Sequence, residues 1–76
     1  MSEMKRQTVV SSNIAEVGHR ADTLFIKFNS GGVYSYQHVA LHYYNLLLSS
    51  ESVGKAFHQH IKNHFVHKKL NEDVFA

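Results

Sequence analysis

Three histidines near the C-terminal end of this 76-residue chain have a spacing that could hold a metal ion. His60, His64 and His67 are four and three residues apart, so a helix would place them on one face. Two imidazoles one helical turn apart can chelate zinc, copper or nickel. However, the chain has no cysteine to complete such a site, and the nearest carboxylates, Glu72 and Asp73, lie beyond the expected end of the helix. We therefore expect a plain polar helix face, with no cofactor and these histidines only as weak metal candidates.

Residue types that catalyse reactions are present, but not in catalytic patterns. Ser11 and Ser12 lack the glycine-flanked turn that exposes a serine nucleophile. Glu16 and Asp22 are single carboxylates near expected turns, whereas acid–base catalysis usually requires a paired site. The double glycine at residues 31–32 joins two expected strands and does not open a helix, so it is no phosphate-binding loop. We expect a non-enzymatic protein.

Lysines and aromatic residues point instead to binding. Lysines concentrate in the last third of the chain, where a cationic stripe could neutralise the phosphates of a nucleic acid. Aromatic residues on the expected strands could stack on unpaired bases. The candidate nucleic-acid-binding residues are Phe25, Lys27, Tyr34, Tyr36, Lys55, Lys62, Lys68 and Lys69.

The face on which the tyrosine pair lies depends on the register of one hairpin. Tyr34 and Tyr36 share a face because side chains alternate along a strand. With a loop of two or four residues, Phe28 sits opposite Val33, and the tyrosines join Phe25 and Lys27 on the outer face. With the three-residue loop 30–32, Phe28 faces Tyr34 instead, and the tyrosines complete the core. Burial is the commoner use of large aromatics, but the sequence leaves both registers open.

The elements that position these residues follow from the hydrophobic pattern. Residues 8–17 alternate imperfectly, as a bulged first strand would, and residues 18–22 resemble a turn. Residues 23–28 form the clearest strand, with Leu24, Ile26 and Phe28 on one face and Phe25 and Lys27 on the other. A glycine-containing turn then leads into a third strand over residues 33–39.

From residue 40 onward the apolar residues follow the period of a helix. One face of the first helix is formed by Val39, Tyr43, Leu46 and Leu47. Ser52 is suited to cap the start of a second helix, because its hydroxyl can accept from a backbone N–H one turn later. Phe57, Ile61 and Phe65 recur every four residues and predict that this helix continues to about residues 70–71.

Together these elements predict an α+β domain, in which a three-stranded antiparallel sheet is followed by two helices packed on one face (β-β-β-α-α). We expect residues 1–7 to be a flexible N-terminus, residues 8–71 a single domain, and residues 72–76 a C-terminal tail. A chain this short has a small core and is expected to be marginally stable.

Composition narrows the class of protein further. The formal net charge of +2 neither requires nor excludes a polyanionic partner. No apolar run approaches the roughly 20 residues of a membrane span, and the first residues lack the apolar core of a signal peptide. The absence of cysteine fits a reducing compartment. We therefore expect a cytoplasmic protein with no membrane partner.

The order of these segments resembles the KTSC domain, a small bacterial and phage module named for the C-terminus of some lysyl-tRNA synthetases. The resemblance covers residues 10–65 and is carried by the Tyr-Ser-Tyr triplet at residues 34–36. It extends to the Ser-Val-Gly entry of the second helix at residues 52–54, which is followed by Phe57. The resemblance implies the fold above and a family without an established activity, for which a role in RNA binding has been proposed.

Three functions remain open on this basis. We first expect a non-enzymatic binding module for RNA or single-stranded DNA, with lysines for affinity and sheet aromatics for stacking. The alternative is a small protein-interaction factor of a phage or mobile element that docks on a host protein. A homodimer that hides the outer sheet face is the third. Salt dependence separates them, because nucleic-acid binding weakens steeply with salt and apolar docking need not.

Overall fold

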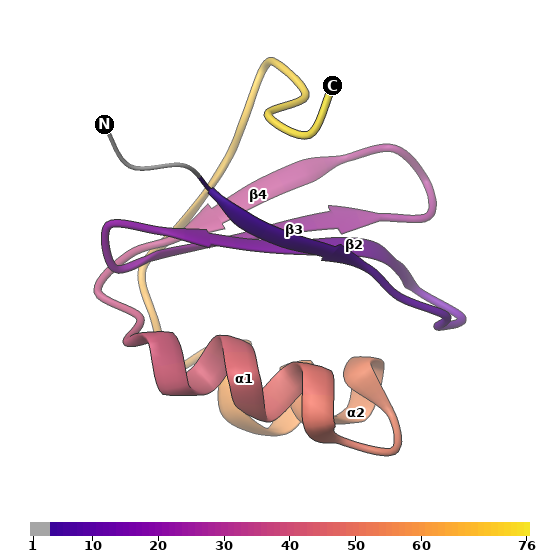
Figure 1. Ribbon diagram of the computed structural model, residues 1–76. Coiled ribbons are helices and arrows are strands. Elements are labelled where there is room, and N and C mark those ends of the chain that lie inside the picture. The colour runs from indigo at the N-terminus through magenta and orange to yellow at the C-terminus, as the bar shows by residue number, and fades with distance from the viewer. Residues whose placement is uncertain (1–3) are drawn as a thin grey trace.

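In a computed structural model, which describes residues 4–76, the chain forms a five-stranded antiparallel sheet with two helices beneath one face (Figure 1). The strands are β1 (Lys5–Thr8), β2 (Ile14–Arg20), β3 (Thr23–Phe28), β4 (Val33–Tyr36) and β5 (His67–Lys69), and the helices are α1 (Leu41–Ser49) and α2 (Val53–His60). The strands lie in the sheet in chain order, from β1 at one edge to β5 at the other. Along the chain, both helices lie between β4 and β5, and these two strands are neighbours in the sheet.

The predicted α+β class, with an antiparallel sheet followed by two helices, is confirmed, but three strands were too few. Residues 5–7, which we expected to be flexible, belong to β1, where Lys5 pairs with His19 and Thr8 with Glu16. The side chains of β1 are all exposed, so this edge strand carries no hydrophobic alternation that would mark it in the sequence. The expected first strand over residues 8–17 is instead the end of β1, a loop and the start of β2. Residues 1–3 of the expected flexible segment lie outside the described part of the chain.

The turn between β2 and β3 is shorter than the sequence indicated. Residues 18–20 continue β2, and only Ala21 and Asp22 form the connection, with φ angles of 49° and 58°. A two-residue turn of this kind usually carries glycine or asparagine, because both central residues adopt positive φ. In this sequence the glycine lies earlier, at Gly18. For this reason the turn was predicted to begin at residue 18, whereas β2 continues to Arg20.

The register of the β3–β4 hairpin places the tyrosine pair on the helix-facing side of the sheet. Tyr34 pairs with Ile26 and Tyr36 with Leu24, and both partners are fully buried. The turn has three residues, 29–31, and is therefore of the odd kind that directs the tyrosines toward the core. It begins one residue earlier than the three-residue loop considered from the sequence, so the pairing partners differ from those expected.

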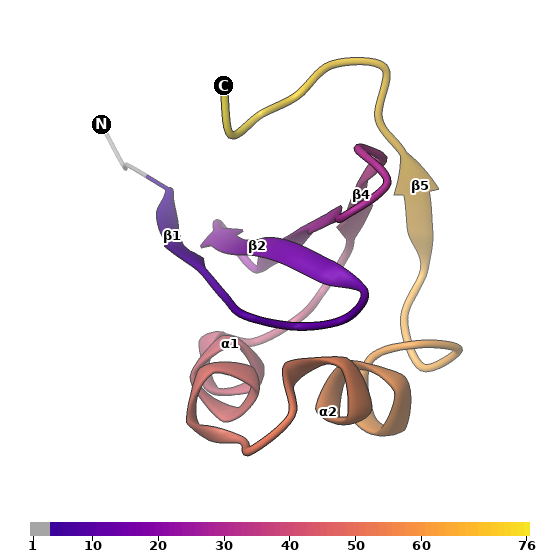
Figure 2. The ribbon, with the colours of Figure 1, turned by 90° about the vertical axis from the view of Figure 1, so that its right-hand side faces the viewer.

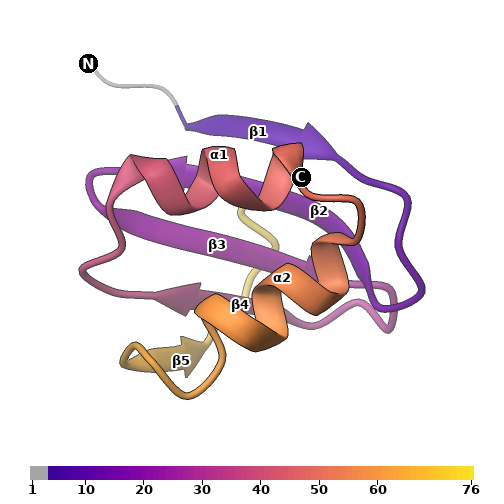
Figure 3. The same cartoon turned by 90° about the horizontal axis from the view of Figure 1, so that it is seen from below.

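The main core lies between the helices and this inner face. Its completely buried side chains are Ile14, Val17, Leu24, Ile26, Val39, Leu47 and Ile61. On α1 the buried residues are Tyr44 and Leu47, whereas Leu46, expected on the buried face, is exposed. Figure 3 shows α1 and α2 side by side across the strands. Neither helix in the described part of the chain has the length and apolar character to cross a membrane.

Helix α2 begins where it was predicted to begin, but it ends about ten residues before its predicted end. The hydroxyl of Ser52 accepts from the backbone N–H of Lys55, as expected of a cap. The last helical residue is His60, and Asn63 adopts a φ of 68° in the turn that follows. Asparagine tolerates this left-handed conformation and commonly ends helices. The predicted burial of Phe57 and Ile61 is confirmed, but Phe65 lies beyond the helix.

A second, smaller core covers the outer face of the sheet. It consists of Phe25, Val33 and Phe75, with Met4, Leu70 and Val74 packed against them. The covering chain is the segment after β5, residues 70–76, which we call the C-terminal strap; Figure 2 shows it crossing the side opposite the helices. Two polar contacts fasten it: Arg6 donates to the carbonyl of Phe75 at 2.7 Å, and Lys27 forms an ion pair with Asp73.

Gly18 makes room for this strap. A Cβ at this position would lie 2.8 Å from the sulfur of Met4 and 2.9 Å from a ring carbon of Phe75. Such distances are too short for real Cβ contacts, so any larger residue would displace one of these side chains. The glycine that suggested a turn in the sequence is therefore explained by close packing on the outer face.

Candidate functional site

A groove of about 630 Å³ opens between α2, the turn of the β3–β4 hairpin and the segment that enters β2. We call it the aromatic groove. Its lining residues are Ser12, Asn13, Ile14, Phe28, Asn29, Ser30, Tyr34, Tyr36, Gly54, Phe57, His58, Lys62, Asn63 and His67. The volume is in the range of roughly 300–1,000 Å³ that small-molecule and cofactor sites occupy.

Five aromatic side chains form a closed circuit of contacts along the groove. Phe28 meets Tyr34 and Phe57 edge to face, with ring centroids 5.5 and 5.7 Å apart. Tyr36 contacts Phe57 edge to face at 5.5 Å and stacks on His67 at 5.3 Å. The contact between Tyr34 and His67, at 6.2 Å, closes the circuit. Each ring therefore has two aromatic neighbours that hold it in place.

The members of this circuit differ in what they offer a ligand. Tyr36 and Phe57 are both only 5% exposed and act as the floor of the groove. Phe28 and Tyr34 are partly buried, and His67 is exposed, so these three keep ring surface available for stacking. Burial, followed by the charge of Tyr34, raises the pKa of Tyr36 above its ordinary value. A tyrosine hydroxyl is protonated at neutral pH even without this shift, so it can donate a hydrogen bond.

The charged groups at the groove are all cationic or able to become so. Lys62 and the imidazoles of His58 and His67 line it, and none of the lining residues, all within the described range, is a carboxylate. The Nζ atom of Lys62 lies 3.4 Å from Nε2 of His58. Lys69 pairs with Tyr34 in the β4–β5 ladder and so belongs to the same face of the sheet. This arrangement favours an anionic ligand.

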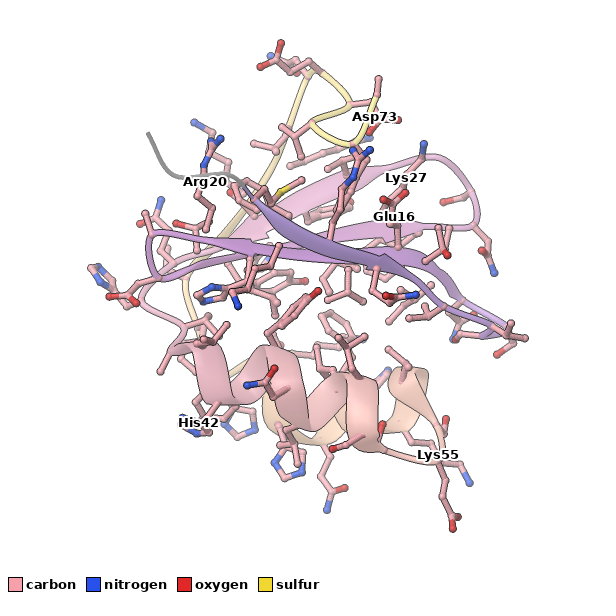
Figure 4. All side chains as sticks on the ribbon, in the orientation of Figure 1. Glu16, Arg20, Lys27, His42, Lys55 and Asp73 are labelled. Carbon is pink, nitrogen blue, oxygen red and sulfur yellow. The ribbon has the colours of Figure 1, made fainter. Side chains whose placement is uncertain are left out.

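Two of the candidate residues, Phe25 and Lys27, are on the outer face and are already engaged. Phe25 is 8% exposed beneath the C-terminal strap, so it presents no ring face to solvent. Lys27 pairs with Asp73, and Figure 4 shows both on the side of the sheet away from the helices. The hydrogen bond from Lys27, and then that from the backbone N–H of Phe75, lowers the pKa of Asp73. The sequence suggested a solvent-facing stacking platform on the outer face. That prediction is wrong, because Phe25 is buried and Lys27 is paired.

The four lysines of the last third do not form one stripe. Lys62 lines the aromatic groove, and Lys69 is on its side of the sheet. Lys68 pairs with Ser35 and so points to the opposite face. Lys55, in the first turn of α2, is exposed and directed away from the sheet (Figure 4). Two lysines out of the four thus remain near the tyrosine pair.

The predicted histidine stripe does not exist. His60 is the last residue of α2, His64 lies in the following turn and His67 belongs to β5, so no helix face presents all three. Across residues 4–76, no three potential ligands are grouped closely enough to hold a metal ion. The early end of α2 at residues 60–63 is the physical reason for this correction.

Several groove residues were not singled out in the sequence. Phe28 was assigned only to a strand face, Asn13 to the bulged first strand and Asn29 to the hairpin turn. His58 was not considered. Asn29 could have been found from its turn position next to the tyrosine strand. Its backbone N–H donates to the carbonyl of Asn13 at 2.8 Å, which ties the two loops together. That approach joins segments 16 residues apart and has no local signal in the sequence.

Comparison with known proteins places this architecture in a family. Residues 10–65 match the family model of the KTSC domain. The crystal structure of a KTSC domain protein from Yersinia pestis superimposes with a TM-score of 0.83 at 34% sequence identity. The match covers 90% of this chain and 99% of that one. A search of curated proteins found no match.

Proposed function

This chain belongs to the KTSC domain family, and we propose that it is a non-enzymatic binding module for single-stranded RNA or DNA that holds its ligand in the aromatic groove. Proteins that bind single strands combine aromatic rings for base stacking with a positively charged groove that follows the backbone. Both components occur at the aromatic groove. The outer sheet face has neither a free ring in Phe25 nor a free charge in Lys27.

One observation carries this proposal, namely the coincidence of open ring surface and unopposed positive charge. Phe28 and Tyr34 keep part of their surface exposed, although a chain of this size gains from burying every apolar atom. Lys62 lies beside them and, within the described residues, has no carboxylate partner. A docking site for an acidic or apolar protein segment would not require stacked rings and phosphate-binding cations together.

The host-protein alternative has less support from the surface. The large apolar side chains with most exposure among the described residues are Val10, Leu41, Leu46 and Val66. They are distributed over two loops and α1. Larger contiguous apolar patches usually mark protein-docking surfaces. We therefore retain the host protein, like a homodimer, as an outcome that the binding test distinguishes.

The test is a titration of labelled oligouridine and mixed-sequence oligonucleotides by fluorescence anisotropy at two salt concentrations. Wild-type protein should bind both ligands, and affinity should fall as salt rises, because phosphate contacts release counterions. The double change Lys62→Gln and Lys69→Gln should weaken binding to both and reduce the salt slope by about 1–1.5, at roughly 0.7 per lost phosphate contact on a single strand.

Lys55→Gln with Lys68→Gln is the matched control, because it removes the same charge from positions away from the aromatic groove. This control should retain most of the affinity and slope. Equal losses in the two double variants would indicate diffuse electrostatic attraction and overturn the groove assignment. No binding at tens of micromolar protein in low salt would overturn nucleic-acid binding altogether, and a protein partner would then be the better account.

A further inference from the structure

The two ends of the aromatic groove differ in chemistry. One end, which we call the cationic end, is formed by His58, Lys62 and His67 from the last turn of α2, the turn after it and β5. The other, the neutral end, is formed by the loops before β2 and after β3 and contains Ser12, Asn13, Asn29 and Ser30. The rings of Phe28, Tyr34 and Phe57 line the same groove. A ligand that matches this combination has an anionic group, a flat ring and a hydrogen-bonding edge.

The neutral end is held rigidly before any ligand arrives. The backbone N–H of Asn29 donates to the carbonyl of Asn13 at 2.8 Å, and the side-chain amide of Asn29 donates to the carbonyl of Ser11 at 2.9 Å. The hydroxyl of Ser11 in turn accepts from the backbone N–H groups of Asn13 and Ile14. A preorganised polar end favours a ligand of defined shape, because little ordering entropy is lost on binding.

Gly54 keeps α2 close to this end. A Cβ on Gly54 would meet the hydroxyl oxygen of Ser11 at 3.3 Å, and Gly54 itself lines the aromatic groove. The Ser11 hydroxyl is committed to two backbone donors, so it cannot move away freely. The first turn of α2 and the loop before β2 are thus in close contact at this end of the groove.

The cationic end suits one phosphate group. Lys62 and His58 are 3.4 Å apart through their terminal nitrogens, close enough for both to reach the oxygens of a single phosphate. Among the described residues no carboxylate forms an ion pair with either of them. The volume of the groove, about 630 Å³, is that of a site for one small ligand, in the range of small-molecule and cofactor pockets.

From this geometry, and resting on the proposed function, we infer that the aromatic groove is a pocket for a single unpaired nucleotide. Its base lies against Phe28, Tyr34 and His67, its phosphate binds at Lys62 and His58, and its polar edge faces the amides of the neutral end. The strand on either side of this nucleotide remains largely in solvent. One nucleotide unit should therefore supply most of the binding free energy of a longer strand.

The inference can be tested by NMR titration of the labelled protein with uridine monophosphate, adenosine monophosphate, uridine and inorganic phosphate, and with oligouridines of two to eight nucleotides. Mononucleotides should shift the signals of Phe28, Tyr34 and His58. Each should bind at least about tenfold more tightly than uridine or phosphate alone, because a charge-assisted contact and a stacked base act together. Affinity should rise by less than about tenfold from the dinucleotide to the octanucleotide.

Lys62→Gln should remove most of the advantage of the mononucleotide over uridine, whereas Lys55→Gln, on the same helix but outside the groove, should leave it intact. Phosphate binding as tightly as the mononucleotide would overturn the inference and leave a simple anion site. Steadily rising affinity with length, without the groove signals moving, would also overturn it while leaving single-strand binding intact. The absence of binding to any oligonucleotide would remove both the inference and the proposed function.

Discussion

The two faces of the sheet differ in how completely they are covered. The outer face, where Phe25 and Lys27 alternate along β3, is sealed by the C-terminal strap and its ion pair. The inner face, which carries most of the hydrophobic core, opens at one end into a groove beside Tyr34. A face that must be covered for stability can therefore still present an open groove beside its covering helix.

The difference arises from how each covering element lies on its face. Helix α2 lies along the aromatic groove and contributes Gly54, Phe57 and His58 to its lining. Phe28 and Tyr34 lie beside this helix and stay partly exposed. The strap reaches further across the opposite face and buries Phe75 against Phe25 and Val33. Exposure in this small domain is thus decided by how a helix and a terminal segment cover the sheet, and less by the alternation within any strand.

The largest expected effect concerns the inner face. Phe57→Ala should destabilise the domain by about 3–5 kcal/mol, and Ile61→Ala by about 2–5 kcal/mol, because each leaves a cavity beneath α2. Domains this small have little stability to lose, so either variant could be unfolded at 37 °C. Thermal and urea denaturation followed by circular dichroism measures the effect. Wild-type melting of either variant would show that α2 does not cover the core as described.

Phe75→Ala is the matched change on the outer face and should cost less, about 1–2 kcal/mol, because a terminal segment can relax around the missing ring. Hydrogen exchange should quicken in β1 and around the strap while the centre of β3 stays protected. A loss as large as that of Phe57→Ala would mean that the two cores form one cooperative unit, and would contradict the separation of the faces drawn here.

The smallest expected effect concerns the ion pair of the strap. The pKa of Asp73 is lowered in the folded protein, so the stabilisation is present above the ordinary carboxyl pKa of about 4 and is lost as the pH falls through the lower folded value. Asp73→Asn keeps the acceptor for the N–H of Phe75 but removes the charge. Its melting temperature should therefore lie slightly below wild type at pH 6 and converge with it near pH 2.

Glu72→Gln is the control for that comparison, because it removes a neighbouring charge from an exposed side chain. This variant should melt like wild type across the same pH range. If the difference between Asp73→Asn and wild type persisted unchanged at low pH, the carboxylate of Asp73 would not be the group that fastens the strap.

Local patterns predicted those parts of the fold that local chemistry determines. Strand β3 was located from the apolar residues Leu24, Ile26 and Phe28 on one of its faces, and Ser52 from its capping chemistry. Strand β1 was missed because it is stabilised by pairing with β2 and carries only exposed, polar side chains. The four-residue period through Phe65 extended α2 too far, although Asn63 marks a plausible end to the helix.

The candidate site was predictable in composition but not in assembly. The tyrosines and Lys62 were selected from the sequence, and they do lie at one groove. The burial of Phe25 could not be foreseen, because Phe75 reaches it across fifty residues of chain with no pattern in between. The three histidines were predicted to lie on one helix, but this helix ends at His60. Of the three, only His67 reaches the groove, as part of an edge strand.

The central claim is that a single-stranded ligand contacts the inner face, at the aromatic groove, and not the outer face. Photochemical cross-linking with short RNA that carries 4-thiouridine, followed by mass spectrometry of the adducts, tests it most directly. We expect adducts on Phe28, Tyr34 or His67, which Lys62→Gln weakens and excess uridine monophosphate competes away. Adducts on Ser35, Lys68 or the residues of the C-terminal strap would place the ligand on the outer face and contradict this account.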